Sequence, residues 1–146
     1  MVGAALPTFS EYALMLLPIT GLYAALLGLL IIVLLLRIVA KRWKHRVGVG
    51  DGGEKSLLLA IRAHGNAIET IPIALILLAA LELNKGSALT LHIFGATLLV
   101  GRLLHALGLS RSPKVSFGRF VGTVLTVTVI IGLAVANLLA FWMSRA

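Results

Sequence analysis

The sequence predicts an all-α integral membrane protein, a bundle of four transmembrane helices, from three observations. Of the 146 residues, 60% are hydrophobic and only 12% are charged, whereas about 25% of the residues of a soluble domain are charged. Four apolar regions each reach the ~20 residues that a helix needs to cross the hydrocarbon core. The segments between them are short, so we expect residues 1–146 to form a single membrane domain.

The four spans are predicted at about residues 12–39, 56–83, 87–109 and 118–143. The first has no charged side chain from Tyr12 to Leu36 and is too long for the apolar region of a signal peptide. Ser87 can cap the third helix, and the polar segment from Ser110 to Lys114 separates the third helix from the fourth. The chain has no cysteine, which excludes disulfides and thiolate metal sites, and we expect no metal.

The net charge of +8 is concentrated in two of the predicted loops. Cytoplasmic loops of membrane proteins carry an excess of lysine and arginine, so we expect these two loops in the cytoplasm and both termini on the outer side. This accounts for the charge without nucleic acid and places the loops near anionic lipid headgroups. The cations of the first loop are Lys41, Arg42, Lys44, Arg46 and Lys55, those of the other are Arg111, Lys114 and Arg119, and the opposite side has only Lys85 and Arg145.

The second and third spans contain polar residues that are rare inside membranes. Arg62, Asn66 and Glu69 are spaced four and three residues apart, which places them on one face of a helix. Arg102 and His105 share a face of the third span. A charge at the centre of a membrane helix costs on the order of 2.5–3.5 kcal/mol, so such residues usually face the bundle interior and have partners.

The two sets should lie at similar depth, because span 2 leaves the predicted cytoplasmic side and span 3 returns to it. We expect Glu69 to balance Arg62, Arg102 or both, with Asn66 completing the hydrogen bonds. Two arginines against one glutamate leave a positive charge that an anionic ligand would balance. The alternative is an ion-pair network that serves only helix packing.

Two weaker features concern packing and depth. Gly118 and Gly122 form a GxxxG motif at the start of the fourth span, which suits close approach of two helices. Trp43 and Trp142 lie near predicted span ends, where aromatic rings anchor helices at the interface.

The polar motifs resemble the signature of the MAPEG family, the membrane-associated proteins in eicosanoid and glutathione metabolism. The resemblance is carried by Arg62-Ala-His-Gly-Asn-Ala-Ile-Glu69-Thr-Ile-Pro72 and by Gly101-Arg-Leu-Leu-His105, and it spans roughly residues 12–142. The Gly-Asp-Gly-Gly element at residues 50–53 is similar to that of the bacterial inner-membrane branch of the family, the YecN-like proteins.

This resemblance implies a homotrimer in the bacterial inner membrane, with glutathione as co-substrate bound between protomers near the cytoplasmic side. It implies a glutathione-dependent transferase or peroxidase that acts on lipophilic electrophiles arriving from the lipid. The residues expected to form the glutathione site are Arg62, Asn66, Glu69, Arg102 and His105, and the catalytic arginine of the fourth helix corresponds to Arg119. A cation beside a thiol lowers its pKa and raises the thiolate fraction, which is the role expected for Arg119.

The sequence departs from the family pattern at three positions. Leu109 stands where many eukaryotic members have a tyrosine, Gly65 where some have an arginine, and Phe120 where the prostaglandin synthase has a serine. These losses leave a second hypothesis open, a non-catalytic membrane protein of the same fold that binds lipid or a small anion. A small multidrug transporter is disfavoured, because the first span contains no carboxylate between Tyr12 and Leu36.

Overall fold

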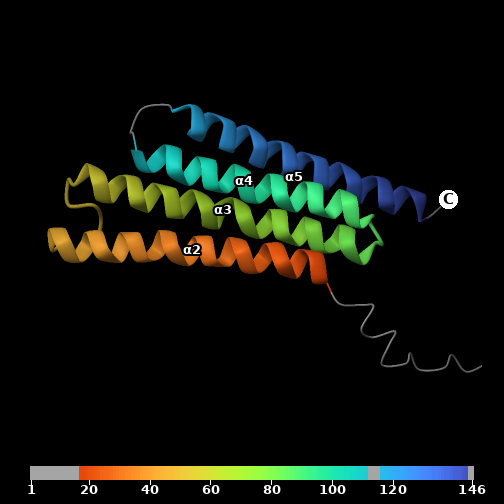
Figure 1. Ribbon diagram of the computed structural model, residues 1–146, viewed down its shortest axis with the longest axis horizontal. Helices are drawn as coiled ribbons and strands as arrows, with labels where there is room; N and C mark the ends of the chain where they lie inside the picture. The colour runs from red at the N-terminus through yellow and green to blue at the C-terminus, as the bar shows by residue number, and fades with distance from the viewer. Residues whose placement is uncertain (1–16, 112–115, 145–146) are drawn as a thin grey trace, which may run out of the picture.

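The computed structural model describes residues 17–111 and 116–144, and these residues form four long helices (Figure 1). They are α2 (Pro18–His45), α3 (Lys55–Leu83), α4 (Ala88–Arg111) and α5 (Phe117–Met143). Each of them is long and apolar enough to cross a membrane, which confirms the predicted all-α fold of four spans. Residues 12–16 of the first predicted span lie outside the described residues, as do Lys114 and Arg145.

The first described helix ends later than the sequence pattern indicates. α2 continues to His45, although the span was expected to end near residue 39 and the cations after it to lie in a loop. At ~1.5 Å per residue its 28 residues extend about 42 Å, which exceeds the ~30 Å hydrocarbon core. The last turns, with Lys41, Arg42 and Lys44, are still helical, and their charges make them the part of α2 expected to extend beyond the hydrocarbon core. The helix ends at Arg46, whose φ of 55° is left-handed.

The helices form an up-and-down bundle in which α3 and α4 lie between the other two (Figure 1). α2 packs against α3 and α4, and α5 packs against the same two helices. Within the described chain α2 and α5 do not touch each other. We call the end that holds the α2–α3 loop, the last turn of α4 and the first turn of α5 the basic end of the bundle. Trp43 lies at this end and Trp142 at the other, and both rings are exposed.

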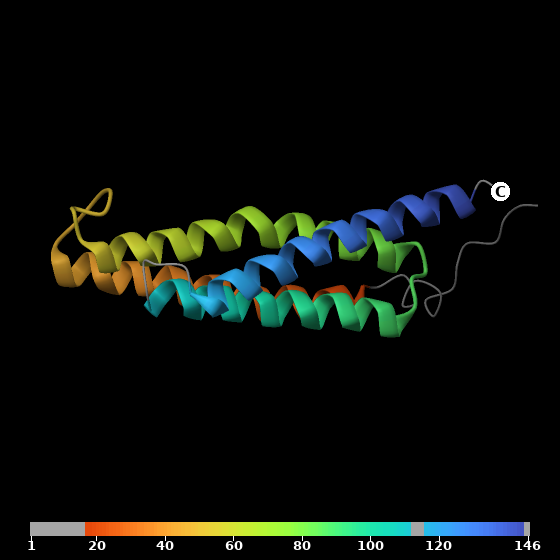
Figure 2. The same ribbon diagram turned by 90° about the horizontal axis from the view of Figure 1, so that it is seen from above.

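α4 and α5 approach each other most closely through glycines on both helices. A Cβ on Gly122 would contact the carbonyl oxygen of Gly101 and would lie 2.6 Å from the backbone nitrogen of His105. A Cβ on Gly108 would contact the backbone nitrogen of Arg119 and would lie 2.7 Å from Ser116 Oγ. Figure 2 shows α5 crossing α4 obliquely. The Gly118–Gly122 motif thus has the predicted role, and glycines of α4 complete it.

At the opposite end, Glu82 of α3 caps the start of α2. The residue before α2 is Leu17, which provides no side-chain cap. The Glu82 carboxylate instead accepts hydrogen bonds from the backbone N–H groups of Ile19 (3.0 Å) and Thr20 (2.8 Å). A carboxylate at a helix N-terminus satisfies free donors and interacts favourably with the helix dipole. Glu82 therefore ties α2 to the end of α3.

Replacing Glu82 by alanine is expected to destabilise this end of the bundle. The substitution leaves two N–H groups of α2 without their acceptor, and loss of an N-terminal cap costs ~0.5–2 kcal/mol. Hydrogen exchange of the Ile19 and Thr20 amides in detergent should accelerate, and the melting temperature should fall. Glu54→Ala is the control, because its carboxylate makes an exposed contact with His45 (3.4 Å) of the kind that contributes little. Equal effects of the two substitutions would contradict the capping role.

Candidate functional site

A cavity of about 250 Å³ opens near the basic end, between α3, α4 and α5. Its polar lining comes from four of the six residues that the sequence singled out, which are Arg62, Asn66, His105 and Arg119. Leu58, Leu59 and Leu109 provide an apolar wall. The cavity therefore combines two guanidinium groups with a surface that suits an apolar molecule.

Arg102 lies behind this lining rather than in it. Its side chain is only 1% exposed. Its Nη1 donates to Asn66 Oδ1 at 2.8 Å, and its Nη2 lies 3.4 Å from His105 Nδ1. Arg102 Nε is buried without a hydrogen-bond partner. The structure thus joins Arg102, Asn66 and His105 in one polar network between α3 and α4, in which Asn66 completes the hydrogen bonds as predicted.

Arg119 reaches the cavity because α5 starts beside α4. Ser116 precedes the helix and its Oγ accepts a hydrogen bond from the Arg119 backbone N–H at 3.4 Å, which is an N-terminal cap. Gly108 leaves room for this first turn to lie directly against α4. The position of Arg119 therefore depends on small residues of α4 that carry no chemistry themselves.

Glu69 differs from the expectation that it balances Arg62 or Arg102. In the part of the chain that the structure describes, no salt bridge joins Glu69 to an arginine, and Glu69 is not among the residues that line the cavity. It lies at the midpoint of α3 on the exposed surface. The physical reason is that Glu69 lies on a part of α3 that no neighbouring helix covers, and the polar contacts of Arg102 are made with Asn66 and His105 instead.

The cavity and its supports also include residues that sequence reasoning did not select. Leu58 and Leu59 were assigned only to a span, but they lie one turn before Arg62, on the side of α3 that faces the cavity. They lie four and three residues before Arg62, and this spacing could have indicated that they share its helix face. Ser116 could have been found as a serine before a helix, which is a preferred N-cap residue, whereas Gly108 had no signal in the sequence, because its effect arises only when α4 and α5 pack together.

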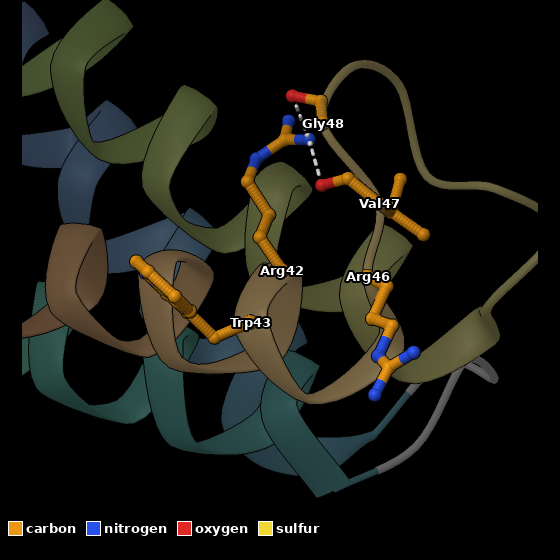
Figure 3. Close-up of a pocket in the computed structure, with 5 residues that line it drawn as sticks. All are labelled: Arg42, Trp43, Arg46, Val47 and Gly48. Carbon is orange, nitrogen blue, oxygen red and sulfur yellow. Dashed lines mark hydrogen bonds between the residues drawn. The ribbon is translucent and has the colours of Figure 1, made fainter.

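A second hollow of about 310 Å³ lies at the end of α2 and is lined by Arg42, Trp43, Arg46, Val47 and Gly48. Arg42 Nη1 donates to the carbonyl oxygens of Val47 (3.3 Å) and Gly48 (3.0 Å). Figure 3 shows the side chains of Arg42, Trp43 and Arg46 pointing in different directions. They do not converge on one ligand, so this hollow is a helix end stabilised by Arg42 rather than the candidate site.

Four membrane-spanning helices with a buried arginine network define the class of protein, an integral membrane protein with an intramembrane polar site. The chain matches the MAPEG family over residues 20–139 and therefore belongs to that family. The match includes the polar residues from Arg62 to Arg119.

Among the relatives, the chain is 44% identical over 90 residues to inner membrane protein YecN of Escherichia coli strain K12. The aligned region covers 62% of this chain and 69% of the relative. The YecN protein of Escherichia coli O6:H1 strain CFT073 gives the same values. The relationship to the bacterial branch, which the Gly-Asp-Gly-Gly element indicated, is thus confirmed, and these relatives are inner membrane proteins by name.

Proposed function

We propose that this protein is a membrane-bound, glutathione-dependent transferase or peroxidase that acts on lipophilic electrophiles. The observation that carries the proposal is the cavity in which Arg62, Asn66, His105 and Arg119 meet an apolar wall. Arginine holds carboxylates in bidentate pairs, and glutathione has two carboxylates and a thiol. The leucines provide a surface for an electrophile that enters from the lipid.

The chemistry assigned to the site begins with the thiol. Arg119 stabilises the thiolate over the thiol by its positive charge, and the thiol proton passes to water. With an aryl chloride as electrophile, the thiolate attacks the ring carbon, a carbon–sulfur bond forms, and the carbon–chlorine bond breaks with release of chloride. No metal or other cofactor takes part in this step. The chain's own contribution is to bind the tripeptide, hold the thiolate and exclude water from the reacting atoms.

A homotrimer forms part of the proposal, because the surface of α3 is polar where a single chain would expose it to lipid. Arg62 and Glu69 are both exposed, and Glu69 lies at the midpoint of a 29-residue helix. Exposure of such a charge to hydrocarbon is costly, whereas a neighbouring protomer and a bound ligand would cover it. Both termini on the outer side, and hence a cytoplasmic cavity, belong to the same proposal.

The direct test is calorimetric titration of the detergent-solubilised protein with glutathione, followed by an assay with 1-chloro-2,4-dinitrobenzene. Asn66→Ala should weaken binding, because the amide lines the cavity. Asn84→Ala is the matched control, since Asn84 ends α3 at the opposite end of the bundle. Wild-type protein that neither binds glutathione nor forms the conjugate would overturn the proposal.

A second candidate function is favoured by one residue of the cavity wall. Leu109 lines the cavity at the position where many eukaryotic members are expected to have a tyrosine. An apolar wall there suits a non-catalytic protein that binds lipid or a small anion and uses its polar residues for assembly. This candidate predicts anion binding without turnover.

Glu69→Gln separates the two candidates. If Glu69 holds the ammonium group of glutathione, neutralising it should raise the glutathione concentration needed for half-maximal turnover about tenfold, equivalent to ~1.4 kcal/mol, while the oligomer persists. If Glu69 serves only assembly, the same change should dissociate the oligomer in detergent. Light scattering of the detergent complex and the conjugation assay, run on the same sample, distinguish these results. Glu54→Gln controls for the change of charge, because Glu54 lies in the α2–α3 loop.

A further inference from the structure

The contacts of Arg102 constrain the hydrogen-bonding state of the cavity. A guanidinium group has five N–H donors and no acceptor. Its contact with Asn66 Oδ1 at 2.8 Å is therefore a donation to the amide oxygen, and its contact with His105 Nδ1 at 3.4 Å is a donation to a ring nitrogen that carries no proton. Both assignments follow from the chemistry of the guanidinium group, which can donate but cannot accept.

Each contact determines the polarity of a residue that lines the cavity. Asn66 has its oxygen engaged by Arg102, which leaves the amide NH₂ group as its free donor. His105 is 4% exposed, and with Nδ1 accepting, the neutral ring carries its proton on Nε2. The groups that remain for a ligand are thus the amide N–H₂ of Asn66 and the Nε2–H of His105, beside the guanidinium groups of Arg62 and Arg119.

We infer that Arg102 is a positioning residue that makes the polar wall of this cavity a set of hydrogen-bond donors, so that the cavity selects an acceptor-only anion and rejects an ammonium group. The inference rests on the proposed function in that it concerns the same cavity. It names the part of the ligand that the cavity takes, a carboxylate or a thiolate. It also places the ammonium group of a peptide ligand outside the cavity, toward Glu69, which lies about one turn farther along α3.

The charge balance around the cavity also favours an anionic ligand. Three arginines surround the cavity or lie behind it, and within residues 17–111 and 116–144 no carboxylate pairs with Arg62, Arg102 or Arg119. Buried charges normally have a partner, because an uncompensated charge in a medium of low dielectric constant is costly. Arg102 is almost completely buried, and its Nε has no hydrogen-bond partner. A bound anion supplies the missing negative charge.

The tautomer of His105 is the first test and needs only the unsubstituted protein. Nitrogen-15 NMR of histidine-labelled protein in detergent distinguishes a protonated Nε2 from a protonated Nδ1, and His105→Gln assigns the signal among the four histidines. We expect a neutral ring with its proton on Nε2. A proton on Nδ1, or on both nitrogens at neutral pH, would overturn the inference. Arg102→Met, which removes every N–H donor of this side chain, should yield a mixture of the two tautomers.

The second test reverses the polarity of the amide. Asn66→Asp keeps an oxygen for Arg102 but replaces the NH₂ donor by a second acceptor. Hexanoate and hexylamine serve as an anionic and a cationic probe of equal length, and shifts of the His105 signal report their binding. We expect the wild-type protein to bind hexanoate in preference to hexylamine, and Asn66→Asp to weaken hexanoate binding tenfold or more. Asn84→Asp, the same change at the opposite end of α3, should bind both probes as the wild type does.

The outcomes separate this inference from the proposed function. Hexanoate preference with the expected tautomer, in a protein that forms no glutathione conjugate, would support the inference and overturn the glutathione transferase. Conjugation by a protein whose His105 carries its proton on Nδ1, or whose Asn66→Asp variant binds hexanoate as tightly as the wild type, would overturn the inference alone.

Discussion

Arg119→Met is expected to lower the rate of glutathione conjugation at neutral pH by about 10²-fold, the typical effect of removing one group that stabilises a developing or resident anion. Arg119 is the cavity residue provided by the first turn of α5. Without its charge, the thiol pKa should return toward the ~8.5 of an unperturbed thiol, and less thiolate would be present at pH 7. The measurement is the conjugation rate with 1-chloro-2,4-dinitrobenzene at saturating electrophile.

The pH profile identifies the cause of the loss. A lowered thiol pKa keeps the thiolate populated at lower pH, so the wild-type rate should level off at a lower pH than the rate of Arg119→Met. The variant should therefore recover part of its activity as the pH rises. Arg119→Lys should retain part of the activity, because it keeps the positive charge, and Lys44→Met removes a cation from the exposed end of α2 as a control. A variant that is slower by the same factor at every pH would contradict the role of Arg119 in stabilising the thiolate.

Gly122→Ala is expected to destabilise the protein by about 1–3 kcal/mol, the usual cost of overpacking, and to disturb the site with it. The added Cβ would contact the Gly101 carbonyl oxygen and lie 2.8 Å from His105 Cβ. Backbone atoms of α4 cannot rotate away as a side chain can, so α4 and α5 must separate. The separation moves Arg119 away from His105, and both the melting temperature and glutathione binding should fall.

Gly28→Ala is the matched control for this prediction. It adds the same methyl group to α2, where a Cβ would meet nothing within 4 Å, and alanine has a higher helix propensity than glycine by up to ~1 kcal/mol. The control should melt at the wild-type temperature or slightly above it. If Gly122→Ala behaved in the same way, the close packing of α4 on α5 would not be the constraint that positions Arg119.

Sequence periodicity predicted the elements of the candidate site, but not all of its contacts. The four-residue spacing of Arg62 and Asn66 placed both on one face of α3, and both line the cavity. The same spacing argument placed Glu69 on that face and expected it to pair with an arginine of the chain. A helical face is broad, and only the packing of α4 decides which part of it is covered. Glu69 lies outside the covered part.

The end of α2 is a second feature that the sequence pattern did not predict. The change from apolar to basic residues after Leu36 marks where the chain leaves the hydrocarbon, but it does not mark where the helix ends. Lysine and arginine are good helix formers, and the first glycine after them is Gly48. The helix therefore continues through the charged segment to His45. Hydropathy predicts depth in a membrane, whereas helix boundaries depend on caps and breakers.

The sequence by itself determined the class of protein, because the number, length and apolar character of the helices follow from composition and from the thickness of a bilayer. It also selected the residues predicted to carry chemistry, since a charge inside a membrane segment is costly and usually has a partner or a function. Only the tertiary structure decided how those residues combine. Which donor meets which acceptor depends on the rotation of each helix and on its distance from its neighbour. Here the glycines of α4 and α5 set that distance, and the position of Arg102 behind Asn66 and His105 determines the polarity of the cavity.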